Sequence, residues 1–220
     1  MFLATQAVQA RGPAANHPSS LASGNPYKCP PQLLEAAKLP PKVTKTHIYF
    51  FGYEGPDPHV CFQQWFPCMF TARVWTATDV NHPSGPRQEF GSTEQVIMHA
   101  KAMLMGDEET ATKIANATHP SEAKLLSRQV RDFDQERWNS RCEAIVAEAN
   151  HAKFSQNEDL KLVLLGTGER IIVEASPDDR IWGISFDAAT AEGKEAEWGK
   201  NLLEKVLMRV RTRLSESSSA

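Results

Sequence analysis

The sequence lacks the features of a secreted, metal-binding or membrane-spanning protein. Its four cysteines include no Cys-x-x-Cys pair and no neighbouring histidine at zinc spacing, and no two histidines form a His-x-x-x-His pair. We therefore expect reduced thiols, no metal ion and no cofactor, with a disulfide between Cys61 and Cys68 as the open alternative. No apolar run approaches the roughly 18–20 residues that cross a bilayer, so we expect a cytoplasmic protein without a membrane partner.

A surplus of basic residues is also missing. The chain has 24 Lys and Arg residues against 27 Asp and Glu residues, which gives a net charge of -3. This balance argues against a protein that binds nucleic acid through its bulk charge. It remains compatible with a small, local basic pocket.

The composition divides the chain into an arm and one domain. Residues 1–45 are rich in Pro, Ala, Ser and Gly, and we predict a disordered or loosely packed arm. An organelle-targeting segment is the alternative, because residues 1–34 contain no Asp or Glu. The remaining length suits a single domain over residues 46–215, followed by a polar tail at 216–220.

Hydrophobic periodicity and capping residues predict several helices around a few short strands. We predict strands or extended segments at 47–51, 60–66, 70–75 and 171–173. Ser92, with Gln95 three residues later, matches a capping box that opens a helix ending near Met105. Further helices are predicted at 108–117, 121–128, 135–154, 158–165 and 199–214. The pattern indicates an α+β fold in which helix dominates.

Two charged residues share one face of the predicted Ser92-capped helix. Glu94 and Lys101 lie seven residues apart, which is close to two helical turns. A ligand could therefore lie along this face and meet both charges. The alternative is that Glu94 only stabilises the positive end of the helix, as first-turn glutamates often do.

A second group of candidates combines arginines with a tryptophan. Arg128, Arg131, Trp138 and Arg141 offer guanidinium forks for phosphate and an indole face on which a base can stack. The alternative, which sequence alone favours, is a solvated basic helix with one core tryptophan.

The stretch from Glu174 to Trp182 has the composition of a binding site. Glu174 directly follows the apolar run 171–173, where a carboxylate is partly desolvated and its pKa rises towards acid–base use. Asp179 follows in a turn, and Trp182 with Gly183 can form an apolar pocket wall. An ordinary strand–turn–strand segment is the alternative interpretation.

The segment 198–201, Trp-Gly-Lys-Asn, precedes the apolar periodicity of the last predicted helix. We expect it to open that helix with free backbone N–H groups. Together with the amide of Asn201, these groups suit an anionic or sugar ligand.

Taken in order, these motifs resemble the NADAR family, also called YbiA-like proteins, over roughly residues 47–214. The matching pieces are Phe50-Phe-Gly52, Cys61-Phe-Gln-Gln-Trp-Phe-Pro67, Ser92-Thr-Glu-Gln95 with Lys101, Ala117 to Pro120 with Ala123-Lys124 and Arg128, Trp138 with Arg141, Lys153-Phe154 with Asn157, Glu174 to Gly183, and Trp198 to Leu202. One departure is Phe62-Gln-Gln-Trp-Phe66, where the family often has Phe-Ser-Asn-Phe-Tyr.

The resemblance implies a mainly helical α+β fold and an N-glycosidase. Family members cleave the ribose–base bond of aminopyrimidine ribotides of riboflavin synthesis or remove ADP-ribose from guanine. It implies a small nucleotide or ADP-ribose substrate, and ADP-ribosylated nucleic acid is a further candidate partner. The residues that it places at the substrate are Glu94, Lys101, Glu174 and Asp179 as catalytic groups, and Phe51, Gly52, Trp65, Arg128, Trp138, Trp182 and Asn201 as binding groups.

The implied mechanism leaves the roles of the two glutamates open. Either Glu174 or Glu94 stabilises an oxocarbenium-like ribose and orients water, while Lys101 offsets charge on the leaving group or holds phosphate. Two other classes of protein remain as alternatives. One is a non-catalytic NAD or ADP-ribose binding module, and the other is a structural protein with a well-packed helical core.

Overall fold

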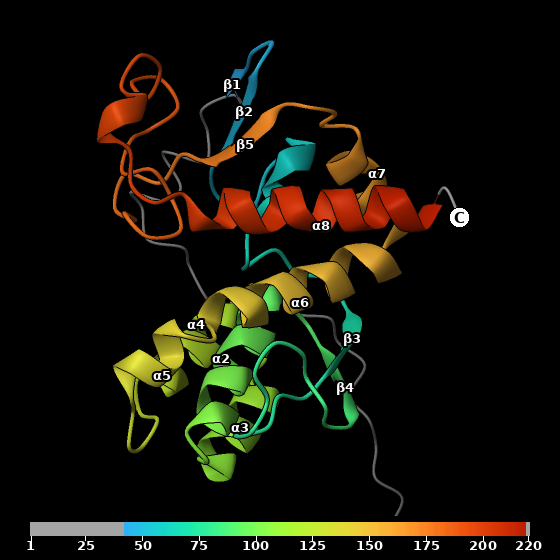
Figure 1. The fold of residues 1–220 in the computed structure, drawn as a ribbon, viewed down its shortest axis with the longest axis vertical. Helices are drawn as coiled ribbons and strands as arrows, with labels where there is room; N and C mark the ends of the chain where they lie inside the picture. Colours follow the sequence, from blue (N-terminus) through green and yellow to red (C-terminus); the bar gives the residue numbers. More distant parts are fainter. Residues whose placement is uncertain (1–41, 219–220) are drawn as a thin grey trace, which may run out of the picture.

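The structure is a computed structural model that describes residues 42–218. Within this range the chain forms a small mixed sheet, a two-stranded ribbon and seven α-helices (Figure 1). In chain order the elements are β1 (Lys42–Val43), β2 (His47–Phe50), η1 (Pro58–Phe62), β3 (Phe70–Arg73), β4 (Arg87–Phe90), α2 (Thr93–Leu104), α3 (Glu108–Ala115), α4 (Pro120–Ser127), α5 (Gln135–Asn139), α6 (Cys142–Gln156), α7 (Glu158–Leu165), β5 (Ile171–Glu174), η2 (Glu195–Glu197) and α8 (Leu202–Ser218). The predicted mainly helical α+β class is confirmed.

The three-stranded sheet joins segments that lie far apart in the sequence. Its order is β1-β2-β5, with β1 antiparallel and β5 parallel to β2. The register sets Phe50 opposite Glu174, so both parallel strands end at the same edge of the sheet. The apolar run 171–173 therefore carries Glu174 to the carboxyl edge of a buried strand, as the sequence predicted.

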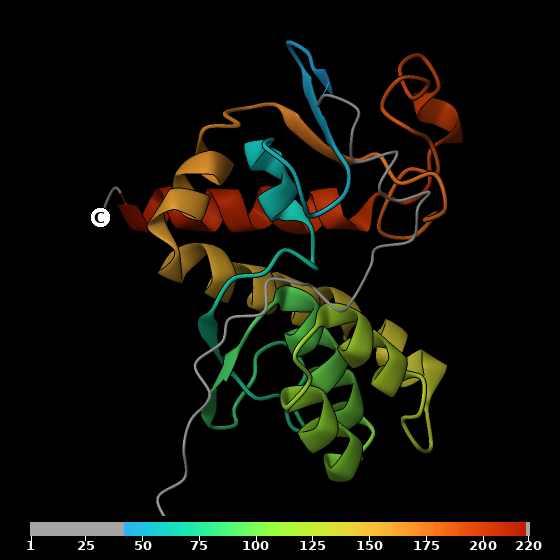
Figure 2. The same ribbon diagram turned by 180° about the vertical axis from the view of Figure 1, so that it is seen from behind.

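The two longest helices, α6 and α8, cross the middle of the molecule and lie between the three-stranded sheet and the group formed by α2, α3 and α4. α8 packs against β5 on one side and against α6 on the other, while α2 packs on α6 and carries α3 and α4 with it (Figures 1 and 2). The main core lies along these contacts and includes Phe62, Ile145, Phe154 and Leu203, all fully buried. This core fixes α2, α4 and α6 relative to the end of β5.

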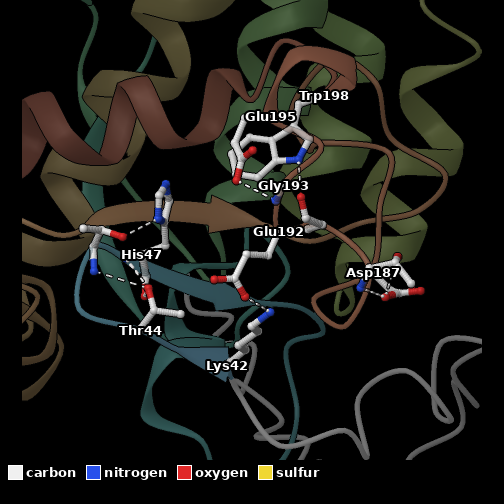
Figure 3. Close-up of polar contacts among 11 residues, drawn as sticks. Lys42, Thr44, His47, Asp187, Glu192, Gly193, Glu195 and Trp198 are labelled. Atoms are coloured by element: carbon white, nitrogen blue, oxygen red, sulfur yellow. Dashed lines mark hydrogen bonds and ion pairs between the residues drawn. The ribbon is translucent and has the colours of Figure 1, made fainter.

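A second, smaller apolar cluster covers the other face of the sheet. Tyr49 and Val173 pack there against Ala191 from the long loop that precedes α8. Trp198 closes this cluster, and its indole Nε1 donates a hydrogen bond to the carbonyl of Ala191 at 3.0 Å (Figure 3). Lys42 holds the same loop through an ion pair with Glu192 at 2.6 Å (Figure 3). Trp198 therefore has a structural role, because it anchors the loop before α8 to the sheet.

Several predicted elements need correction. The segment predicted as extended at 60–66 begins instead as the 3-10 helix η1, because Pro58 occupies its first turn and the Asp57 carboxylate accepts from the His59 N–H at 3.1 Å. The helix predicted at 135–154 is two helices, α5 and α6, that are broken at Ser140 and Arg141. Part of the predicted loop 78–88 belongs to β4.

Regular structure extends into the predicted arm 1–45, where β1 lies, and into the predicted tail 216–220, where α8 ends. The boundary at residue 46 falls between β1 and β2, residues 1–41 lie outside the described part of the chain, and α8 extends to Ser218. Cys61, Cys68 and Cys142 are free thiols, so the alternative of a Cys61–Cys68 disulfide is wrong. None of the helices within residues 42–218 has the length and apolar character required to pass through a bilayer.

Candidate active site

A cavity of about 280 Å³ lies where α2, α4, α5 and α6 meet the segment after η1 and the end of β5. Its size is just below the range of about 300–1,000 Å³ that is typical of small-molecule sites. It brings together residues from distant parts of the sequence. Of the residues predicted for the site, those that line this cavity are Trp65, Glu94, Lys101, Arg128, Trp138, Glu174, Asp179 and Trp182.

Glu174 is a buried carboxylate with one oxygen unsatisfied. The residue is 7% exposed, its Oε1 accepts a hydrogen bond of 2.7 Å from Gln63 Nε2, and its Oε2 has no hydrogen-bond partner in the part of the chain that the structure describes. Burial is the main cause that raises the pKa of Glu174 to about 7, and the negative charges of Asp179 and Glu94 act in the same direction. At neutral pH this group can therefore give or take a proton.

Glu94 is equally buried but has a cationic partner. Lys124, in α4, places its Nζ 3.1 Å from Glu94 Oε1. The first turn of α2 that carries Glu94 is fixed by the Gln64 carbonyl, which accepts from Glu94 N at 2.9 Å and from Thr93 Oγ1 at 3.0 Å. The two glutamates therefore differ in environment: Glu94 has its charge balanced, and Glu174 does not.

The amide that reaches Glu174 is held in place by a fully buried lysine. Lys153, in α6, is 0% exposed, and its Nζ donates to the carbonyls of Cys61 at 2.6 Å and Gln63 at 3.1 Å. The ring of Phe66 lies 5.2 Å from this Nζ. Burial lowers the pKa of Lys153 to about 8, so the amine stays largely protonated at neutral pH. Lys153 thus fixes the backbone that aims Gln63 at Glu174.

Cations line the part of the cavity formed by α2 and α4. Lys101 donates from Nζ to the Ser127 carbonyl at 3.1 Å and lies 4.4 Å from the ring centroid of Phe133. Burial, together with the positive charges of Lys124 and Arg128, lowers the pKa of Lys101. Arg128, at the end of α4, is exposed at the cavity. Such a group of cations suits a phosphate.

The loop 176–184 presents Trp182 to the cavity. Asp179 Oδ1 accepts from the N–H groups of Ile181 and Trp182, both at 2.8 Å, which closes the turn. Gly183 is required here, because a Cβ would lie 2.9 Å from the Glu174 carbonyl oxygen. Asp179 therefore has two roles: its Oδ1 fixes the turn of the loop, and the residue also lines the cavity.

The segment 198–201 does not offer free N–H groups to a ligand, so that expectation was wrong. Each N–H donates to a backbone carbonyl: that of Gly199 to Ile184 at 2.9 Å, that of Lys200 to Arg180 at 2.8 Å and that of Asn201 to Gly183 at 3.3 Å. The helix α8 begins only at Leu202. These bonds fix the loop that carries Trp182, which is a structural role.

Three predicted residues lie outside the cavity lining. Asn201 is buried behind it, where its Oδ1 accepts from the Glu174 N–H at 3.4 Å and positions the end of β5. Phe51 and Gly52 follow β2, and Gly52 turns the chain there with a φ of 74°. In the arginine cluster, Arg131 pairs with Asp107 at 2.7 Å, and Arg141 donates to the Asp79 carbonyl at 3.2 Å.

Asn201 gives a prediction about stability, because its φ of 46° lies in the left-handed region. Asn201→Ala is expected to lower the free energy of unfolding by about 1–2 kcal/mol, since it strains the backbone and leaves the buried Glu174 N–H without its acceptor. Asn201→Gly removes the acceptor without the strain and should cost less. Urea unfolding of both variants measures the difference, and equal losses would contradict the role of the backbone.

Sequence reasoning missed three residues that organise the site. Gln63, Lys124 and Lys153 occur within the motifs quoted above, yet none was assigned a role. Two of these roles depend on partners that are distant in the sequence. Gln63 contacts Glu174, which is 111 residues away, and Lys153 contacts the Gln63 carbonyl, which is 90 residues away. The only signal in the sequence was that Lys153 lies at helical spacing from the apolar residues Val146 and Ala149.

The fold and the cavity define the class of this protein: a mainly helical α+β domain in which carboxylates, cations and tryptophans share one small site. The family model described as the NADAR domain matches residues 49–215. An N-glycosidase of Acanthamoeba polyphaga mimivirus is 41% identical over 172 residues, which cover 76% of this chain and 96% of that protein. An N-glycosidase of Nostoc punctiforme is 29% identical over 164 residues, which cover 74% of this chain and 90% of that protein.

A solved structure has the same fold. The NMR structure of the E. coli protein YbiA matches with a TM-score of 0.59 at 23% identity and covers 83% of this chain and 93% of that one. The predicted YbiA-like fold is therefore confirmed. The chain belongs to the NADAR family.

Proposed function

We propose that this protein is an N-glycosidase, a hydrolase that cleaves the bond between a phosphorylated ribose and a nitrogenous base. The observation that carries the proposal is the asymmetry of its two buried glutamates. Glu174 makes no ion pair within residues 42–218 and has a pKa raised to about 7 by burial, whereas Glu94 Oε1, which accepts no hydrogen bond, lies 3.1 Å from the Nζ of Lys124. Two carboxyl groups in different environments suit the acid and the charge-stabilising roles of glycoside hydrolysis.

In the proposed reaction, protonated Glu174 donates its proton to the departing base as the bond from the anomeric carbon breaks. The positive charge that develops on the ribose is stabilised by the carboxylate of Glu94. Water then adds to the anomeric carbon, and Glu94 accepts the proton that the water releases. Transfer of this proton to Glu174, directly or through solvent, restores the starting state.

The other lining residues suit recognition of the two ends of such a substrate. The indole rings of Trp138 and Trp182 offer faces on which a base can stack. Lys101 and Arg128 offer donors for phosphate from α2 and α4. The N-glycosidase names of the viral and bacterial relatives support the same reaction type.

Arg128 gives a prediction that tests the phosphate end. Arg128→Ala is expected to raise the KM for a phosphorylated substrate by about tenfold and to change kcat by less than about threefold, because ground-state binding is lost and the reacting groups remain. Steady-state kinetics measure both constants. Lys161→Ala, which removes a charge from α7, is the control. An equal rise in KM for the unphosphorylated nucleoside would contradict a phosphate contact.

The substrate itself is to be tested directly. Purified protein is incubated separately with an aminopyrimidine ribotide of riboflavin synthesis and with ADP-ribosylated guanosine, and release of the free base is followed by mass spectrometry. Release from either substrate supports the enzyme and names the glycoside. Binding of ADP-ribose in isothermal titration without release of base from any substrate would favour the non-catalytic binding module instead.

A further inference from the structure

A second cavity, of about 470 Å³, lies between the β3–β4 ribbon, α6 and the end of α8. Val146 of α6 lines the candidate active site, whereas Ser155, nine residues later and thus on the opposite side of the helix, lines the second cavity. The helix therefore separates the two cavities. The floor of the second is apolar, because the buried side chains of Trp75 and Val96 form it.

Positive charge gathers around this cavity. Arg73 of β3 lies directly opposite Arg87 of β4 in the ladder, and Arg213 is supplied by α8. Glu148 is the one carboxylate among the described residues of the lining, and it already pairs with Arg213 at 2.8 Å and with His82 at 3.3 Å. Three guanidinium groups thus face one committed carboxylate in a chain whose net charge is -3.

This arrangement is unfavourable without an anion. Like charges directly opposite one another on paired strands destabilise the pair. Arg73 is held towards the ribbon by a hydrogen bond from Nη1 to the Gly85 carbonyl at 3.1 Å. The ribbon is in turn fixed to α6, because the Gln156 amide accepts from Thr71 N at 2.9 Å and donates to Thr71 O at 2.7 Å. The arginine pair is therefore placed by the fold.

We propose that this cavity is a second, non-catalytic binding site for a phosphate-bearing anion, held by the guanidinium groups of Arg73 and Arg87. Guanidinium forks bind phosphate oxygens bidentately, and two forks side by side match the charge of a phosphate monoester or a diphosphate. The phosphate can belong to a free nucleotide or to the backbone of a nucleic acid. The site is independent of the reaction proposed above.

The test is isothermal titration of the full chain with inorganic pyrophosphate at low ionic strength. To reduce the contribution of the candidate active site, the titrations are carried out with Arg128→Ala protein. Adding Arg73→Ala and Arg87→Ala to this background is expected to weaken binding by about tenfold or more. Adding Lys113→Ala and Lys161→Ala, which remove two charges elsewhere, should change it by less than about twofold.

Unchanged affinity without Arg73 and Arg87, or an equal loss in the lysine control, would overturn the proposal. If the double arginine variant does not fold, Arg87→Gln replaces it, because the Arg87 side chain makes no hydrogen bond or ion pair within residues 42–218. A smaller loss of affinity is then expected. A mononucleotide and a short single-stranded oligonucleotide are titrated in parallel. Binding of either that depends on Arg73 and Arg87 identifies the source, whereas binding of pyrophosphate alone restricts the ligand to a small free diphosphate.

Discussion

Replacing Glu174 with Gln is expected to lower kcat by at least about a hundredfold while leaving the protein folded. Gln cannot donate the proton that the departing base needs, yet its carbonyl oxygen can still accept the hydrogen bond from Gln63. Steady-state measurement of base release gives the loss. Asp178→Asn, the same change in an exposed neighbouring residue, is the control and should keep near-normal turnover. Near-normal turnover of Glu174→Gln would remove Glu174 from the mechanism.

The same substitution should stabilise the protein at alkaline pH. Folding raises the pKa of Glu174 from 4.5 to about 7, so the folded state retains a proton that the unfolded chain releases between these values. Stability therefore falls as the pH rises through this window, and the full cost, at most about 3 kcal/mol, is present above pH 7. Gln carries no such cost. Thermal unfolding at pH 8 should show a higher Tm for Glu174→Gln, and a lower Tm would contradict the raised pKa.

The pH dependence of turnover follows from the same group. If protonated Glu174 is the acid, kcat falls as the pH rises through about 7, the pKa to which burial raises this carboxyl. Residual activity of the Gln variant should lack this limb. A rise of kcat over the same range would instead assign Glu174 as a base.

Replacing Lys153 with Met is expected to cost about 3 kcal/mol or more of unfolding free energy. The change leaves the carbonyls of Cys61 and Gln63 without the donor that now reaches them at 2.6 and 3.1 Å, in a place that water does not enter. Turnover should also fall, because Gln63 loses the support that aims it at Glu174. Urea unfolding and kinetics measure the two effects.

A matched control separates this effect from the general loss of a lysine. Lys113→Met removes a lysine from the exposed face of α3, where its ion pair with Glu109 contributes little. Its free energy of unfolding should stay within about 0.5 kcal/mol of the unsubstituted protein. If Lys153→Met were as mild as this control, the buried lysine would not be the support of the segment after η1.

Local signals predicted the helices well where a cap was visible. Ser92, the predicted cap, accepts from Gln95 N at 3.2 Å, and the helix predicted from residue 108 is capped by Asp107, which accepts from Thr110 N at 3.2 Å. Periodicity alone did less well, since it joined α5 and α6 into one helix across Arg141. The break could not be predicted, because Arg141 reaches the Asp79 carbonyl, which is 62 residues away.

The sequence by itself determined which local elements carry the chemistry. It set Glu94 and Lys101 on one capped helix, and it put Glu174 at the end of an apolar run that was predicted as a strand. Local periodicity and capping are enough for both, because they act over a few neighbouring residues.

Only the tertiary structure decided how the two glutamates differ. The parallel pairing of β5 with β2 and the packing of α4 on α2 bring Gln63 to Glu174 and Lys124 to Glu94. Burial and partners from distant segments determine a carboxyl pKa, and neither can be calculated from the few residues on either side. For the same reason the tertiary structure turned the segment 198–201 from an expected ligand site into a support for the loop that presents Trp182.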